Sequence, residues 1–300
     1  MARSYAIPDR VTPRSGTRIA SLSSPLKHDL LESGVSRLLA RGWDVSLDND
    51  CLARDAVTAG TREQRLAALT RWRLSPESML WNARGGYGTI ELLDALPARQ
   101  WPRPRWLIGS SDTTAIQLWM MAHGQGSLYA PMPSGALARG TPDATIDRIE
   151  QLLAHDWQPA CLQPNQPLQW LVAPTRGVQA QGPAVGGCLS LVAAMLGTPW
   201  APMTQGHVLF LEDIGEHPFR IVRMLWHLRN AGLLRAPAAV VLGTFPNCDP
   251  PAGSGYTLSS LLGQFFAGAK YPVLYGYPFG HVADVDFCDS IVWGLPYRVG

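Results

Sequence analysis

Short apolar runs alternate with helical patterns along the first half of the chain. Four compact apolar runs predict buried strands, at 18–22, 43–47, 79–83 and 105–108. Periodic apolar positions predict helices between and after these runs, over 30–40, 61–72, 89–96, 113–122 and 143–155. Thr61 and Gln64 have the spacing of a capping box at the start of one helix. This alternation favours an α/β fold with a parallel, doubly wound sheet.

The second half carries more predicted strands than helices. Strands are expected at 168–172, 207–211, 238–242 and 273–275, with bent, glycine-rich strands across 177–187. Helices are expected over 220–228 and 256–267. The predicted organisation is a flexible leader at 1–16, a first domain at 17–157, a proline-rich linker at 158–167 and a second domain at 168–300.

Composition narrows the classes of function. The 300 residues suit two domains, and 46% are hydrophobic, enough for a sizeable core. A net charge of +2 gives no general reason to expect nucleic acid or a membrane surface as a partner. No run approaches the ~20 apolar residues of a membrane helix, and no secretory signal opens the chain. Five scattered cysteines without C-x-x-C, and histidines without H-E-x-x-H, favour a cytoplasmic protein with no zinc site.

Two glycine-containing turns follow predicted strands, at 84–88 and 109–112. In a parallel sheet both turns lie at the carboxyl ends of the strands. Ligands bind at that edge in open α/β sheets. The layout alone therefore predicts a binding site there.

Ser111 lies in a strand–turn–helix segment that has the arrangement of a nucleophile elbow. Gly109, one residue, Ser111 and then a helix would expose the hydroxyl at a helix N-terminus, where an oxyanion is favoured. The backbone N–H of Asp112 is in the usual place for one oxyanion donor. Alternatively, Ser111 or Asp112 simply caps the helix. Thr113 departs from the G-x-S-x-G pattern, and the local sequence leaves both alternatives open.

The turn from Arg84 to Gly88 contains three glycines, which allow a ligand to approach the backbone closely. No Lys-Ser or Lys-Thr pair follows, so it is not a P-loop. A second oxyanion N–H from Gly85 or Gly86 would suit Ser111. A tight turn under packing pressure is the alternative.

Glu212 and His281 could complete a catalytic set. Glu212 ends an apolar strand, so we expect it to be half-buried and to need a cationic partner. That partner could be an imidazolium, or Arg223 in a structural salt bridge. His281 follows Phe279-Gly280 in a loop, where a surface or capping histidine is the alternative. Cys188 is interpreted as a small buried residue.

Five segments, taken together and in order, resemble the L,D-carboxypeptidase family of serine peptidases. That family includes the muramoyltetrapeptide carboxypeptidases and their microcin-immunity relatives. The segments are WNARGGYG at 81–88, LIGSSDTTA at 107–115, VGGCLS at 185–190, VLFLED at 208–213 and PFGH at 278–281. Cys188 departs from the family, whose members usually have Asn at that place.

The resemblance implies a Ser-Glu-His triad, which falls on Ser111, Glu212 and His281. It also implies a flavodoxin-like or amidotransferase-like N-terminal domain and a β-rich C-terminal domain, with the site in the cleft between them. The implied reaction releases terminal D-Ala from murein tetrapeptides in peptidoglycan recycling, without metal or cofactor, in a cytoplasmic homodimer. Arg84 is a candidate for binding the substrate carboxylate, or is structural.

Two other functions stay open on the sequence. A microcin-immunity-like hydrolase would use the same triad on acyl-adenylate analogues. A non-catalytic protein that binds peptidoglycan fragments is the second alternative, although such a protein would not need Ser111, Glu212 and His281 together.

Overall fold

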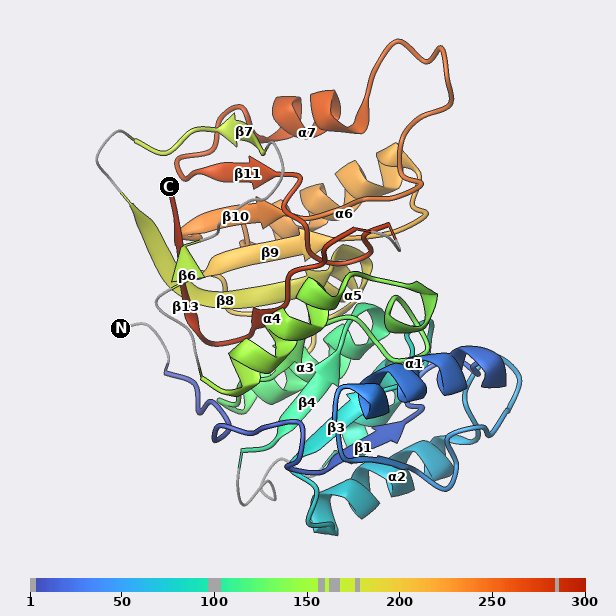
Figure 1. The fold of residues 1–300 in the computed structure, drawn as a ribbon. Helices are drawn as coiled ribbons and strands as arrows, with labels where there is room; N and C mark the ends of the chain where they lie inside the picture. Colours follow the sequence, from blue (N-terminus) through green and yellow to red (C-terminus); the bar gives the residue numbers. More distant parts are fainter. Residues whose placement is uncertain (1–3, 97–103, 156–159, 162–167, 176–178, 284–285) are drawn as a thin grey trace.

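Two sheets, one above the other in Figure 1, form the body of the molecule. The structure is a computed structural model, and it describes residues 4–96, 104–155, 160–161, 168–175, 179–283 and 286–300. The first sheet lies in the lower half of the view and the second in the upper half. None of the helices within these ranges is long and apolar enough to cross a bilayer.

The first sheet is the parallel sheet that the alternation predicts. Its order is β12-β5-β4-β3-β1-β2, and only the edge strand β12 is antiparallel to its neighbour. The strands are β1 (Thr17–Ala20), β2 (Val45–Leu47), β3 (Met79–Asn82), β4 (Trp106–Gly109), β5 (Leu128–Tyr129) and β12 (Ile291–Val292). The carboxyl ends of β3 and β4 therefore lie side by side, and so do the two turns that follow them.

The helices of this half follow the predicted periodicity, with one correction. They are α1 (His28–Ala40), α2 (Arg62–Leu74), α3 (Thr114–Ala122) and α4 (Asp143–Leu153). The capping box at Thr61 and Gln64 is present. The helix predicted at 89–96 is instead a 3-10 helix, η1 (Thr89–Ala95). It is a short connector, the setting in which 3-10 geometry is common. Two further 3-10 turns are η2 (Ser111–Thr113) and η3 (Leu137–Arg139).

The second sheet has a parallel centre and antiparallel neighbours toward its edges. Its order is β6-β13-β8-β9-β10-β11-β7, with β8 to β11 parallel to one another. The strands are β6 (Ala160–Cys161), β7 (Gln169–Val172), β8 (Ala180–Cys188), β9 (Val208–Glu212), β10 (Ala239–Leu242), β11 (Val273–Tyr275) and β13 (Pro296–Val299). The helices are α5 (Leu189–Ala194), α6 (Pro218–Asn230) and α7 (Leu258–Phe266). The bent strands predicted across 177–187 are one long strand, β8, in the described part.

The N-terminal and C-terminal segments both contact the two halves of the molecule. The C-terminal segment supplies β12 to the first sheet and β13 to the second. The N-terminal segment, predicted to be a flexible leader, packs against the chain: Val11 is buried, and the Tyr5 hydroxyl lies 2.9 Å from His207 Nε2. The domain limits at 157 and 168 stay a prediction, because 156–159 and 162–167, which span the end of the first predicted domain and most of the predicted linker, lie outside the described residues.

A buried aromatic cluster connects the sheets beneath the predicted site. Phe210 on β9 lies with its ring centroid 5.4 Å from Phe279 and 6.0 Å from Trp293. Trp293 in turn lies 5.3 Å from Tyr129, at the end of β5. Packed aromatic rings are rigid anchors. The ends of β5 and β9 are therefore held in a fixed relation.

Candidate active site

Ser111 sits in a strained turn between β4 and the helical segment that leads into α3. Its φ is 57°, in the left-handed region that residues other than glycine and asparagine rarely occupy. Such a conformation costs about 1–3 kcal/mol unless the surroundings enforce it. One of those surroundings is Tyr129, whose hydroxyl accepts a hydrogen bond from the Ser111 N–H at 2.9 Å. This is the geometry of a nucleophile elbow.

The glycine turn after β3 lies directly against Ser111. A Cβ on Gly85 would come within 2.8 Å of Ser111 Cβ and 2.9 Å of its Oγ, so only glycine fits. Gly86 has a φ of 113°, and its Cβ would lie 2.3 Å from Ser24 Oγ. That same oxygen accepts a hydrogen bond from the Tyr87 N–H at 3.1 Å. Ser24 therefore holds the turn with its backbone close to the Ser111 hydroxyl.

Glu212 positions His281 through two hydrogen bonds. Its Oε2 accepts hydrogen bonds from His281 Nδ1 at 2.6 Å and from the His281 backbone N–H at 3.2 Å. The carboxylate is fully buried rather than half-buried as expected. A Cβ on Gly280 would lie 2.4 Å from Glu212 Cγ, so glycine is required there. The partner of Glu212 is thus the imidazole and not Arg223, whose guanidinium lies 5.5 Å from the Phe219 ring.

The environment of His281 favours its protonated form. Burial lowers the pKa of the imidazole, but the charge of Glu212 and the hydrogen bond to it outweigh burial. Asp213 adds a smaller effect in the same direction, and Arg139 opposes it. The pKa of His281 is therefore raised above its ordinary value of 6.5. Such a group can take up a proton readily and hold it until a leaving group needs it.

Ser111 and His281 line one cavity of about 330 Å³. The cavity lies at the carboxyl edge of the first sheet, where the layout of the chain predicts a binding site. Its lining residues are Lys27, Leu30, Arg84, Gly85, Gly86, Ser111, Met132, Ser134, Gly135, Arg139 and His281. Among the described residues, no hydrogen bond joins Ser111 Oγ to His281. Catalytic hydrogen bonds are often longer without substrate and tighten when it binds.

The cavity wall is cationic. Lys27, Arg84 and Arg139 line it, and no carboxylate is among its described lining residues. One guanidinium nitrogen of Arg84 donates to the Pro25 carbonyl at 2.8 Å, which ties this side chain to the chain after β1. Such a wall suits an anionic ligand.

The Asp112 side chain does not line the cavity. It is buried, and its Oδ2 accepts a hydrogen bond from the Thr89 N–H at 2.9 Å. The Thr89 hydroxyl donates to the Asp112 carbonyl. Burial raises the pKa of the Asp112 carboxyl, and the Thr89 contact opposes that effect. The side chain thus joins η1 to the elbow, while the predicted role of Asp112 concerns its backbone N–H.

Tyr129 was not singled out by the sequence, yet it contacts two of the predicted site residues. Its hydroxyl donates to Glu212 Oε1 at 2.5 Å while accepting from the Ser111 N–H. Asn82 is a second residue that the sequence did not single out: its side-chain nitrogen donates to Thr113 Oγ1 at 2.8 Å, just after the elbow, and to Ser23 Oγ at 3.1 Å. Asn82 lies near the end of the strand predicted at 79–83, just before the glycine turn, which is a usable signal. Tyr129 lies on a two-residue strand without periodicity.

Cys188 is buried, as predicted. Its N–H donates to Thr114 Oγ1 at 3.1 Å, and its thiol contacts Asp213 Oδ1 at 3.5 Å. Burial raises the pKa of this thiol well above its usual range, so it is not an activated nucleophile.

Within the described ranges, no group of three His, Cys, Asp or Glu side chains is placed to hold a metal ion.

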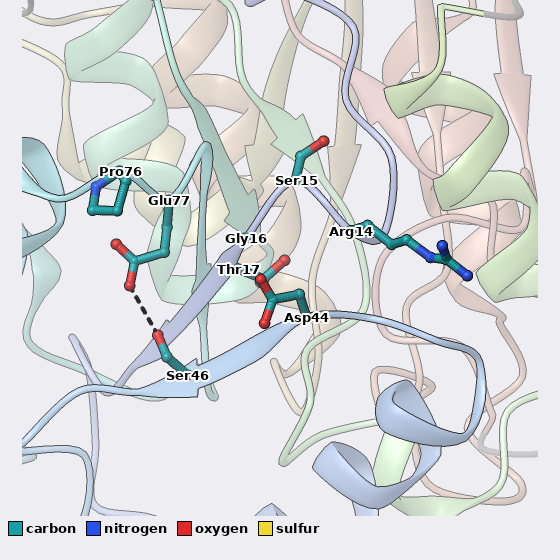
Figure 2. A pocket seen from close by; sticks show the side chains of 8 residues that line it. All are labelled: Arg14, Ser15, Gly16, Thr17, Asp44, Ser46, Pro76 and Glu77. Carbon is teal, nitrogen blue, oxygen red and sulfur yellow. Dashed lines mark hydrogen bonds between the residues drawn. The ribbon is translucent and has the colours of Figure 1, made fainter.

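A second depression lies at the opposite, amino-terminal edge of the first sheet (Figure 2). It encloses about 360 Å³ around the starts of β1 and β2. Glu77 points across it to the Ser46 hydroxyl, which donates at 3.1 Å, and also accepts from Arg18 at 2.8 Å. The residues that line it in the described part of the chain include no histidine and no cysteine. The cavity of Ser111 and His281 is therefore the better candidate for catalysis.

Comparisons with known proteins identify the family and the fold of the chain. Sequence profiles of the LD-carboxypeptidase N-terminal and C-terminal domains match residues 17–130 and 181–287. The murein tetrapeptide carboxypeptidase of Pseudomonas aeruginosa is 32% identical over 272 residues, which cover 87% of this chain and 86% of that protein.

Solved structures give the same fold over nearly the whole chain. The muramoyltetrapeptide carboxypeptidase from Oxalobacter formigenes matches with a TM-score of 0.78 at 27% identity, over 94% of each chain. The microcin C7 self immunity protein MccF matches with a TM-score of 0.82 at 19% identity, over 96% of this chain and 94% of that one. The two domain profiles and the relative at 32% identity show that the chain belongs to the LD-carboxypeptidase family.

Proposed function

We propose that this protein is a serine L,D-carboxypeptidase that removes the terminal D-Ala from murein tetrapeptides, with Ser111, His281 and Glu212 as its catalytic triad. The observation that carries the proposal is the shared cavity, which is lined by a serine in a left-handed turn and by an imidazole held by a buried carboxylate. Relatives named murein tetrapeptide and muramoyltetrapeptide carboxypeptidases support the substrate class.

In the acylation step, His281 Nε2 accepts the Ser111 proton as Oγ attacks the carbonyl carbon of the scissile amide. The Oγ–C bond forms and a tetrahedral oxyanion results. The C–N bond then breaks, and the imidazolium gives its proton to the departing amine of D-Ala. Glu212 keeps the Nδ1 proton in place and stabilises the imidazolium in between.

The oxyanion would be held by backbone N–H groups. We assign one to Asp112, which follows the nucleophile, and one to Gly85 or Gly86 in the turn packed against it. Each such donor contributes about 3–4 kcal/mol of transition-state stabilisation in serine hydrolases. The positive end of α3 adds to the same field.

Deacylation reverses the roles with water as the nucleophile. His281 takes a proton from water, whose oxygen attacks the ester carbon. The C–Oγ bond breaks, the proton returns to Ser111 and a shortened peptide acid leaves. One water is consumed per D-Ala released, and none of these steps uses a metal or cofactor.

The cationic wall gives a basis for choosing a peptide with a free terminal carboxylate. Lys27, Arg84 and Arg139 line the cavity. Arg84 is held by Pro25, which limits the guanidinium to a narrow range of positions. We assign Arg84 to the D-Ala carboxylate and Lys27 to a further acidic group of the peptide.

We also propose that the enzyme works in the cytoplasm as a homodimer. Four of its five cysteines are buried and free in the described structure, which suits a reducing compartment. Light scattering on the purified protein tests the assembly: a mass near twice 32.7 kDa is expected, and a mass of 32.7 kDa would contradict the dimer.

The function is tested by offering matched substrates to the purified enzyme. Mass spectrometry should show loss of one alanine from a murein tetrapeptide. The amide of that peptide, which lacks the terminal carboxylate, should react at least tenfold more slowly, since a charge-assisted contact is worth about 1.5–3 kcal/mol. Aspartyl sulfamoyl adenosine, a ligand of the structurally similar MccF, tests the alternative. Cleavage of that compound in preference to tetrapeptide would overturn the proposal.

A further inference from the structure

We propose that Tyr129 is a positioning residue of the hydrolytic site, whose single hydroxyl sets both the elbow of Ser111 and the free oxygen of Glu212. The inference rests on the proposed function and extends it to a residue outside the triad. Tyr129 is not among the described residues that line the cavity, so it acts through the Ser111 backbone and the Glu212 side chain.

The Tyr129 hydroxyl makes two hydrogen bonds, one to each side of the proposed site. It accepts from the Ser111 N–H at 2.9 Å and donates to Glu212 Oε1 at 2.5 Å. The other carboxylate oxygen, Oε2, is occupied by His281 at 2.6 Å. A continuous chain of hydrogen bonds therefore runs from the backbone of the nucleophile, through Tyr129 and Glu212, to the imidazole. The two groups that must exchange a proton are tied to the same phenol.

The ring is fixed from several sides, so the hydroxyl has little freedom. It packs 5.3 Å from Trp293 and 5.9 Å from Phe279, two residues before His281. The Trp293 indole donates to Gln117 Oε1 at 3.1 Å, and Gln117 donates to the Leu128 carbonyl at 3.0 Å. Only 1% of the Tyr129 surface is exposed. A rigid donor of this kind costs no reorganisation during the reaction.

The hydroxyl has a definite electrostatic effect. Glu212 is fully buried, and a buried carboxylate oxygen without a donor is costly. Removing the phenol donor would leave Oε1 without a hydrogen bond, and the imidazolium of His281 would become the main partner of the carboxylate charge. His281 would then hold its proton more tightly and would be neutral only at higher pH. Ser111 would lose the acceptor that fixes its N–H.

The test compares Tyr129→Phe with Tyr297→Phe. Tyr297 belongs to the same aromatic cluster and is fully buried; its hydroxyl accepts from the Val292 N–H at 3.0 Å, away from the site. Both variants remove one buried hydroxyl and leave one backbone N–H without its partner. They are matched in those two losses, and only Tyr129→Phe also removes the donor to Glu212.

For Tyr129→Phe we expect kcat for tetrapeptide to fall about tenfold to a hundredfold, with KM within about twofold of wild type. The acid limb of kcat/KM should move up by about one pH unit. Tyr297→Phe should keep the wild-type kcat and acid limb. Equal kcat and equal acid limbs in the two variants would overturn the proposal, because a merely structural role predicts no difference.

A fluorophosphonate separates failure of this inference from failure of the function. It phosphonylates an activated serine whatever the natural substrate is. A wild-type enzyme that is labelled at Ser111 but does not cleave tetrapeptide contradicts the proposed substrate alone. Equal labelling rates in wild type and Tyr129→Phe contradict the role of Tyr129 alone. We expect the variant to be labelled about tenfold more slowly.

If Tyr129→Phe does not fold, the wild-type protein still allows a test. With tyrosine labelled at Cζ, the Tyr129 hydroxyl proton should give a slowly exchanging NMR signal. That signal should shift as His281 takes up its proton. A signal that stays constant through that titration would overturn the proposal.

Discussion

The backbone of Ser111 stores strain at the atom where the proposed chemistry starts. A φ of 57° places its side chain out of the turn and toward the cavity shared with His281. Helix capping, the alternative left open by the sequence, is not what the side chain does: neither η2 nor α3 has a side-chain hydrogen bond at its N-cap. The turn is therefore built for exposure of the hydroxyl.

Replacing Ser111 with alanine should reduce tetrapeptide turnover by at least about 10³-fold, because it removes the group that forms the acyl-enzyme. Ser110→Ala is the matched control, since Ser110 is adjacent, buried and absent from the cavity lining. Its kcat should stay within about threefold of wild type. Steady-state kinetics measures both, and similar losses in the two variants would contradict the assignment of Ser111.

The raised pKa of His281 predicts the pH dependence of activity. The imidazole must be neutral to accept the Ser111 proton, so activity should rise with pH as His281 deprotonates. Because its folded-state pKa lies above 6.5, the acid limb of kcat/KM should also lie above 6.5. A pH profile with an acid limb below 6.5 would contradict this electrostatic account.

At the scale of elements, two glycine turns bring β3 and β4 into contact with the site. Gly85→Ala should lower kcat/KM by about 10²-fold, since its Cβ would meet Ser111 at 2.8 Å and displace the hydroxyl. Gly263→Ala in α7 is the control: nothing lies within 4 Å of its Cβ, and it should stabilise the helix by up to about 1 kcal/mol. Enzyme kinetics and urea unfolding distinguish the two effects. An unchanged kcat/KM in Gly85→Ala would contradict the contact.

Elements with strong periodicity could be predicted from the sequence, and short ones could not. The strands β1, β3, β9 and β10 and the helices α1, α2 and α6 follow their apolar patterns. The two-residue strands β5 and β12 carry no period to detect, and their pairing depends on residues about 160 positions apart. Tyr129 lies on one of them. Its contacts with Ser111 and Glu212 could therefore not be predicted from local pattern.

At the scale of the whole molecule, the C-terminal segment fastens α4 to the second sheet. Asp289 accepts from Arg148 Nε at 2.8 Å and from the Tyr277 hydroxyl, and its side chain is only 7% exposed. Breaking a buried pair by removing one partner leaves an uncompensated charge. This contact should matter for stability and not for the chemistry.

Asp289→Ala should lower the free energy of unfolding by about 3 kcal/mol, with kcat per folded molecule unchanged. The control is Asp147→Ala on α4, the helix that carries Arg148. It removes an exposed ion pair with Arg41 and should lower the free energy of unfolding by less than about 1 kcal/mol. Urea unfolding measures both. Equal losses in the two variants would show that Asp289 does not fasten the segment.

The most direct test of the triad is to trap the covalent intermediate. Tetrapeptide mixed with enzyme and quenched in acid within milliseconds should add the mass of the peptide minus alanine, and peptide mapping should place it on Ser111. The adduct should be absent from Ser111→Ala. An adduct on another residue, or undiminished D-Ala release by Ser111→Ala, would contradict the account.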